Sequence, residues 1–222
     1  MSPLNPTRDV LLCYVTDGKA LHASPEKTAQ LLLEKMEDAA RGGVDWIQIR
    51  EKEMSGRALA NLTEKAIRRI PAQCRILIND RLDVACALGA GGVHLGERSV
   101  PVAEAKRLVR ERKLAGQFLV GASTHSLEAA IAAERAGADY LIFGPVFATP
   151  AKAAYGPPQG LERLAEICRR VSIPVVAIGG ITLENARECV AEGARGIAAI
   201  RLFQEAENVA RLVQELREKL AS

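Results

Sequence analysis

Several features that mark specialised proteins are missing from this sequence. Its five cysteines form no CxxC pair and its three histidines lie at no ligand spacing to such a pair, which argues against a disulfide framework or a zinc site. The longest apolar runs have fewer than ten residues, too few to cross a bilayer. The net charge is only +3 and the basic residues are dispersed, unlike a nucleic-acid-binding surface. The start, MSPLNPTRDV, does not resemble a secretion signal. We therefore expect a cytoplasmic protein with free, mostly buried thiols and no nucleic-acid or membrane partner.

The sequence does contain a regular succession of short apolar runs rich in Val, Ile and Leu. Such runs are typical of strands buried on both faces of a parallel sheet. They predict strands at 10–16, 44–50, 75–80, 92–95, 118–123, 139–144, 173–180 and 195–203. Amphipathic spacing predicts helices at 25–40, 56–69, 82–88, 102–112, 126–136, 161–170, 182–191 and 205–220, with Ser126 and Thr182 as candidate N-caps. With no linker or break in composition, the pattern predicts one α/β domain over residues 1–222, a (β/α)8 TIM barrel, with a doubly wound sheet as the alternative.

Polar side chains gather where the predicted strands end, which is where such barrels carry their chemistry. Gln48, Arg50 and Lys52 alternate along the second strand, so a pleated strand would send all three to one side. Two cations and an amide suit a polyphosphate, although solvation of the cations is an equally good interpretation. Asp80 follows the third strand beside Asn79 and is a candidate ion-pair partner, Mg²⁺ ligand or helix cap.

The later strands end in small residues. The turns predicted at 121–123 and 179–180 consist of small residues and open onto helices, where free N–H groups favour a phosphate. The sequence therefore predicts sites for two anionic groups, one at strands two and three and one at strands seven and eight. His94 fits a buried, hydrogen-bonded histidine, whereas His125 is a candidate helix cap or proton shuttle. The long loop 144–160 fits a functional lid.

Six ordered motifs resemble the superfamily of thiamine phosphate synthase and thiazole tautomerase over nearly the whole chain. The motifs are YVTD (14–17), IQIREK (47–52), INDRLDVACALGAGGVHLG (78–96), GASTHS (121–126), ADYLIFGPVFATPAK (138–152) and IPVVAIGGITLENA (173–186). In the synthase, the resemblance implies, an aminopyrimidine methyl pyrophosphate loses pyrophosphate and the resulting cation is captured by the nitrogen of a thiazole phosphate. This chemistry calls for cations, Mg²⁺ and amide donors around the leaving group rather than a strong base.

The resemblance also implies roles for individual residues. Arg50, Lys52 and Lys152 would stabilise the leaving group, Asp80 would hold Mg²⁺ with Ser99 at the second ligand position, and Gly180 would hold the thiazole phosphate. The residues expected around the pyrophosphate are Gln48, Arg50, Lys52, Asn79, Ser123, Thr149 and Lys152. The long loop would then carry Lys152 onto the pyrophosphate.

Three departures from the family pattern bear on the activity. Ser99 stands where an acid is usual, with Glu97 nearby as another substitute, and Ala151 replaces a hydroxyl residue of the lid. Arg201 stands where a small residue is usual; we expect it to bind the thiazole phosphate, with an outward ion pair to Glu205 as the alternative.

Three functions remain open on the sequence. The survival of Gln48, Lys52 and Asp80 favours the synthase, acting on two small-molecule substrates. One alternative is the thiazole tautomerase, in which the resemblance implies that His125 is the acid/base. The other is a non-catalytic barrel that binds thiazole phosphate as a regulator. The sequence does not determine the oligomeric state, and a homo-oligomer is compatible with it.

Overall fold

The computed structural model describes residues 10–149 and 157–221. Within them, eight parallel strands pair in chain order and β8 pairs back onto β1, which closes the barrel. The strands are β1 (Leu11–Val15), β2 (Trp46–Ile49), β3 (Arg75–Asn79), β4 (Gly92–Leu95), β5 (Leu119–Thr124), β6 (Tyr140–Phe143), β7 (Val175–Ile178) and β8 (Gly196–Ala199). The predicted TIM barrel is confirmed, and the doubly wound alternative is wrong because an open sheet would leave β1 and β8 unpaired.

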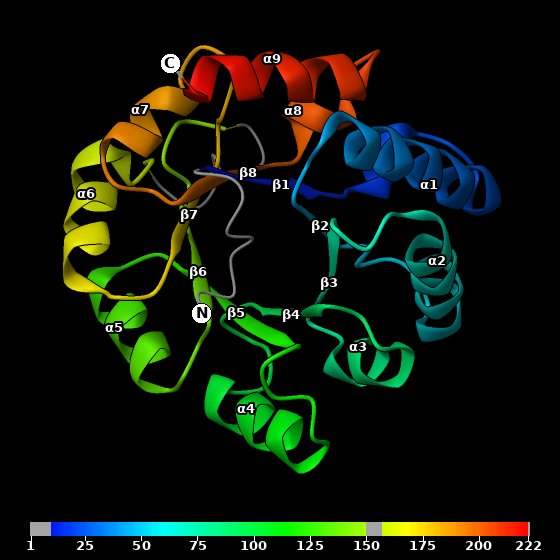
Figure 1. The fold of residues 1–222 in the computed structure, drawn as a ribbon, viewed down its shortest axis with the longest axis horizontal. Helices are drawn as coiled ribbons and strands as arrows, with labels where there is room; N and C mark the ends of the chain where they lie inside the picture. Colours follow the sequence, from blue (N-terminus) through cyan, green and yellow to red (C-terminus); the bar gives the residue numbers. More distant parts are fainter. Residues whose placement is uncertain (1–9, 150–156, 222) are drawn as a thin grey trace.

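Helices form a ring around the strands, and α9 lies beside α1 (Figure 1). The described helices are η1 (Gly18–Leu21, a 3₁₀ turn), α1 (Pro25–Gly42), α2 (Gly56–Arg69), α3 (Leu82–Leu88), α4 (Val102–Glu111), α5 (Leu127–Arg135), α6 (Gly160–Arg170), α7 (Ala186–Ala191), α8 (Arg201–Gln204) and α9 (Val209–Ala221). The bounds predicted for α2 and α3 are confirmed. None of the described helices is long and apolar enough to cross a membrane.

Strand side chains alternate between two apolar clusters. Leu12 and Tyr14 of β1 join a cluster that includes the helices, whereas Cys13 and Val15 join a second cluster built from strand residues and the segments directly after them. The second cluster is therefore the interior of the barrel, and odd and even positions of each strand have different surroundings. All five cysteines are free, and three of them are buried.

Two predicted elements near the C-terminus were wrong in their bounds. The predicted strand 195–203 ends at Ala199, and residues 201–204 form the short helix α8 instead. Phe203 and Gln204 anchor this helix over β1, because the Phe203 ring packs on Tyr14 at 5.4 Å and Gln204 Oε1 accepts a hydrogen bond from the Tyr14 hydroxyl at 2.6 Å. A short apolar run alone does not distinguish a strand from such a helical turn.

The predicted helix 182–191 begins later than expected. Ser126 caps α5 as predicted, but α7 begins only at Ala186. Asn185 holds the preceding residues as a turn, because its side chain accepts from the Thr182 N–H at 2.8 Å and donates to the Gly180 carbonyl at 2.9 Å. Thr182 therefore caps a turn rather than the helix.

Candidate active site

The ends of β2 to β5 bring four polar side chains together at one mouth of the barrel. These side chains occupy strand positions that face the barrel interior. They are Gln48, Asn79, His94 and Ser123. Gln48 is only 2% exposed, and its Nε2 donates to Asn79 Oδ1 at 2.9 Å. Asn79 pairs in register with His94. The amide of Asn79 is thereby fixed, with its own Nδ2 left as a donor at the mouth.

His94 is a buried, hydrogen-bonded histidine, as the sequence predicted. It is 2% exposed, and its Nδ1 lies 3.2 Å from the Tyr140 hydroxyl while its Nε2 lies 2.8 Å from Ser123 Oγ. Burial, and then the positive charge of Arg50, lowers the pKa of His94 to about 3. The ring is therefore neutral at neutral pH and serves as a hydrogen-bonding group rather than a cation.

Arg50 lies half-buried directly after β2. Its backbone N–H donates to Thr16 Oγ1 at 3.0 Å, which ties the end of β2 to the end of β1. The strand ends at Ile49, so the pleat that was predicted to carry Gln48, Arg50 and Lys52 to one side does not extend to Lys52. Lys52 is instead placed by an exposed turn.

Sequence reasoning missed Glu51, the residue between these two cations. Its carboxylate accepts from the Thr16 hydroxyl and from the Gly18 N–H, the latter at 2.9 Å. Burial raises the pKa of Glu51, while these two hydrogen bonds and the Arg50 charge act in the opposite direction. Glu51 thus anchors the loop after β1 beneath Arg50. The sequence shows an acid between two cations at a strand end, but it does not show the Thr16 and Gly18 partners that give Glu51 this role.

Asp80 is exposed and does not cap a helix. Its backbone adopts a left-handed φ of 66°, and its N–H donates to the His94 carbonyl at 2.8 Å. The N-cap position of α3 is Arg81, which makes no side-chain capping bond. Within the described ranges, the Asp80 carboxylate accepts no hydrogen bond, so it is available to a ligand.

Of the two residues considered as a second metal ligand, Ser99 is hydrogen-bonded within a turn and Glu97 lies near His125. Ser99 Oγ accepts from the Gly96 N–H at 2.8 Å, which closes a tight turn after β4. Glu97 Oε1 lies 4.0 Å from His125 Nε2. No group of three or more acidic, His or Cys side chains suited to a metal occurs in residues 10–149 and 157–221.

His125 follows β5 and lies between two loops. Its Nδ1 is hydrogen-bonded to the Gly144 carbonyl after β6, and its Nε2 faces Glu97. Ser126, not His125, accepts the capping bond of α5. His125 is therefore held by one nitrogen, while the other lies next to a carboxylate at the rim.

The two glycines after β7 allow the loop after β6 to approach closely. Gly179 and Gly180 have φ of 98° and 67°, and a Cβ on Gly180 would lie 2.6 Å from the Ala148 carbonyl oxygen. The Phe147 N–H donates to the Gly179 carbonyl at 2.9 Å. Thr149 is half-buried at the last described position before residue 150, and Lys152 lies outside the described residues.

Arg201 lies on the outer side of the rim. Its side chain is 53% exposed and its Nε is 3.9 Å from Glu205 Oε1, the geometry of the outward alternative. Ile200, rather than Arg201, packs against the interior cluster. The sequence did not show which side Arg201 would face, because the residues on both faces of β8 are apolar.

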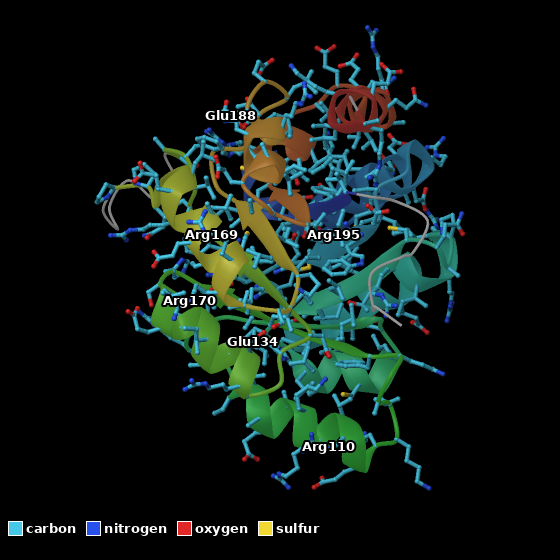
Figure 2. The ribbon with its side chains drawn as sticks, turned by 60° about the vertical axis from the view of Figure 1, so that its left-hand side comes forward. Arg110, Glu134, Arg169, Arg170, Glu188 and Arg195 are labelled. Carbon is cyan, nitrogen blue, oxygen red and sulfur yellow. The ribbon has the colours of Figure 1, made fainter. Side chains whose placement is uncertain are left out.

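Other arginines lie at the opposite end of the barrel. Figure 2 labels Arg169 and Arg170 on α6, Arg110 on α4 and Arg195 before β8. Helices of this fold end where the next strands begin, away from the mouth that holds Gln48 and Ser123. Cations there suit the negative ends of the helix dipoles. This arginine-rich end is therefore distinct from the candidate site.

Comparison with known proteins places these residues in a family context. A family model described as thiamine monophosphate synthase matches residues 12–203. The putative thiamine-phosphate synthase of Geobacter sulfurreducens is 46% identical over 171 residues, covering 76% of this chain and 78% of that protein. The thiamine-phosphate synthase of Methanoculleus marisnigri is 45% identical, with 83% and 85% covered. The solved structure of thiamine phosphate pyrophosphorylase from Pyrococcus furiosus is 36% identical with a TM-score of 0.75, covering 98% of each chain.

Proposed function

Because the chain belongs to the thiamine monophosphate synthase family, we propose that it joins an aminopyrimidine methyl diphosphate to a thiazole phosphate and releases diphosphate. The observation that carries the proposal is the grouping of Arg50, Asn79, Ser123 and Asp80 around one barrel mouth. Arg50 offers positive charge and Asn79 and Ser123 offer neutral donors to a polyanion, while the Asp80 carboxylate, which accepts no hydrogen bond from described residues, could hold a cation that accompanies it. None of them is a strong base, and the reaction needs none.

In the proposed mechanism, the bond between the pyrimidine methylene carbon and the diphosphate oxygen breaks first. Negative charge grows on the diphosphate, where Arg50, the Asn79 amide and the Ser123 hydroxyl stabilise it. Lys52 and Lys152 would add charge from the adjoining loops, and Gln48 holds the Asn79 amide in place. The thiazole nitrogen then supplies the electron pair for the new carbon–nitrogen bond. The N–H groups at Gly180 would bind the thiazole phosphate, and Thr149 would line the loop side. Arg201 would have to rotate from its outward position beside Glu205 to reach this phosphate.

The residues present fit a Mg²⁺ ion that arrives with the diphosphate. Mg²⁺ is commonly held by one or two carboxylates together with substrate phosphates, and the exposed Asp80 carboxylate accepts no hydrogen bond from described residues. When bound, the ion would neutralise charge on the leaving group. Asp80 would hold it, with Ser99 contributing only by giving up its turn bond to Gly96.

The substrate-free protein is therefore expected to bind Mg²⁺ weakly, with tight uptake only when diphosphate is present. Titration calorimetry with and without inorganic diphosphate measures this. Ser99→Asp restores an acid and should tighten binding of the metal alone, because a second carboxylate adds charge at the site. Tight binding by the substrate-free wild type would mean that a further acidic ligand has been overlooked.

The decisive assay supplies both substrates and Mg²⁺ and measures thiamine phosphate and released diphosphate, with each substrate omitted in turn. Equal amounts of both products are expected. A protein that binds thiazole phosphate yet forms neither product would instead fit the regulatory barrel. We also propose a single domain acting in the cytoplasm, the latter because all five thiols are free.

A second candidate function is the thiazole tautomerase, favoured by the placement of His125. Its Nε2 faces Glu97 beside the mouth, and the second metal carboxylate is absent at Ser99. A histidine oriented by a backbone carbonyl and next to a carboxylate can carry the proton that isomerises a thiazole carboxylate phosphate.

His125→Ala separates the two enzymes. The coupling step takes no proton to or from this imidazole, so a synthase is expected to keep most of its coupling rate when the aromatic thiazole is supplied. A tautomerase should lose roughly 10²–10⁴ of its rate with its proton carrier. Both rates are measured on one preparation. Collapse of coupling with the aromatic thiazole would contradict the synthase assignment of roles.

A further inference from the structure

A tyrosine in the barrel interior stands behind His94 and Ser123. Tyr140 is 1% exposed, and its hydroxyl lies 3.2 Å from His94 Nδ1. The other ring nitrogen of His94 lies 2.8 Å from Ser123 Oγ, which is half-buried at the mouth. Three side chains from β6, β4 and β5 thus form one hydrogen-bonded row from the interior to the candidate site.

The direction of these hydrogen bonds follows from the tyrosine. Burial raises the pKa of Tyr140 well above its usual value, so the phenol keeps its hydrogen. Among the described residues, His94 Nδ1 is the acceptor within reach of that hydrogen. If Nδ1 were the protonated nitrogen, the buried phenol hydrogen would have no acceptor, a situation that folded proteins avoid. The neutral ring therefore carries its hydrogen on Nε2.

This tautomer determines what Ser123 does. With Nε2 protonated, His94 donates to Ser123 Oγ, and the serine oxygen is the acceptor. The hydroxyl hydrogen of Ser123 is then left to point at a ligand. In the opposite tautomer, Ser123 would donate its hydrogen to the ring and would present only lone pairs to an anion.

We propose that Tyr140 and His94 are positioning residues: Tyr140 fixes the His94 hydrogen on Nε2, so that Ser123 turns its own hydroxyl hydrogen toward an oxygen of the bound diphosphate. The identity of the anion rests on the proposed function, whereas the orientation of the three groups does not. The geometry supports the proposal, because each ring nitrogen of His94 has a hydroxyl partner and only the Nε2 tautomer gives the buried phenol hydrogen an acceptor.

The interior is shaped to hold the tyrosine ring in this position. A Cβ on Gly121 would lie 2.0 Å from Tyr140 Cζ, so the glycine of the GASTHS motif leaves room for the ring. Gly121 lies within β5 and not in a phosphate-binding turn, which corrects the interpretation of 121–123 given by the sequence. Trp46 also packs on the Tyr140 ring, with ring centroids 4.6 Å apart. Phenylalanine retains these contacts and is therefore a conservative replacement.

The proposal is tested by Tyr140→Phe, with ¹⁵N spectra of the histidine rings and with inorganic diphosphate plus Mg²⁺ as the probe. Wild type should carry the His94 hydrogen on Nε2, and Tyr140→Phe should give a mixture of tautomers. Diphosphate binding should weaken about threefold to tenfold, the worth of one hydrogen bond. Tyr140→Phe should add nothing further in a Ser123→Ala background, because both changes remove the same donor.

Tyr14→Phe is the matched control. It also removes a buried phenol hydroxyl, one that donates to Gln204 on the helix-facing side of β1. It should leave the His94 tautomer and diphosphate binding unchanged, so general loosening of the barrel is separated from loss of positioning.

Three outcomes would overturn the proposal. The first is a wild-type His94 hydrogen on Nδ1, and the second is no diphosphate binding by the wild type. The third is a double variant whose loss of diphosphate affinity equals the product of the losses caused by Tyr140→Phe and Ser123→Ala alone. None of the readouts requires turnover. A wild type without coupling activity, but with the expected tautomer and binding pattern, would reject the proposed function and leave the positioning role in place.

Discussion

An Arg50→Ala variant is expected to lose about 10²–10³ in kcat for thiamine phosphate formation while folding normally. The guanidinium lies close enough to His94 to depress the pKa of that ring, which places its charge at the mouth where the leaving group would sit. Removing one preorganised donor to developing charge typically costs this much. The backbone bond from Arg50 to Thr16 does not involve the side chain and is retained. Steady-state kinetics at saturating substrates, with circular dichroism as the check on folding, measure the effect.

Arg110→Ala is the matched control for this experiment. Arg110 is an exposed arginine in the last turn of α4, at the other end of the barrel (Figure 2). It carries the same charge and should leave kcat unchanged. An Arg50→Ala enzyme as fast as the Arg110→Ala enzyme would remove Arg50 from the diphosphate site.

The largest effect on stability is expected at Asp45, far from the chemistry. This carboxylate is 5% exposed, accepts from the Leu12 N–H at 2.8 Å and pairs with Arg217 of α9. Arg217 also donates to the carbonyls of Val10 and, at 2.9 Å, of Gly43. The pair thus links the last helix to the start of β1 and to the segment that leads into β2.

Asp45→Ala should lower the free energy of unfolding by about 3–5 kcal/mol, because it leaves a largely buried guanidinium without its carboxylate. Urea unfolding measures the change. Glu215→Ala, which removes an exposed partner of Arg211, is the control and should change stability by less than about 1 kcal/mol. Equal effects of the two substitutions would mean that the Asp45 pair is as weak as a surface pair.

The architecture was predictable because the eight apolar runs are short, regularly spaced and rich in β-branched residues. The bounds of α2 follow directly from amphipathic spacing, and the structure adds Ser55 as the residue that caps the helix. The ends of strands were less predictable. Extending β2 beyond Ile49 gives Lys52 the wrong position, and extending β8 beyond Ala199 predicts a strand where the structure has α8. Where a strand stops depends on tertiary contacts, such as Gln204 with Tyr14, that join distant parts of the chain.

The candidate site was predictable to a similar extent. Gln48, Asn79 and Ser123 stand at strand ends, and the general rule for these barrels leads to them. Tyr140 and Glu51 were missed for different reasons. Tyr140 occupies an apolar run in which nothing marks one face as the interior, and Glu51 follows a strand as one of many charged loop residues. Their partners come from other strands and are visible only once the barrel closes.

The packing of Trp46 has an experimental use. It is the chain's one tryptophan, it is 2% exposed, and its ring touches Tyr140, the first member of the row that leads to Ser123. Unfolding transfers this indole from the packed apolar interior to water, so its fluorescence emission should move to longer wavelength. The barrel interior therefore contains an intrinsic optical probe. It allows unfolding to be followed without a label.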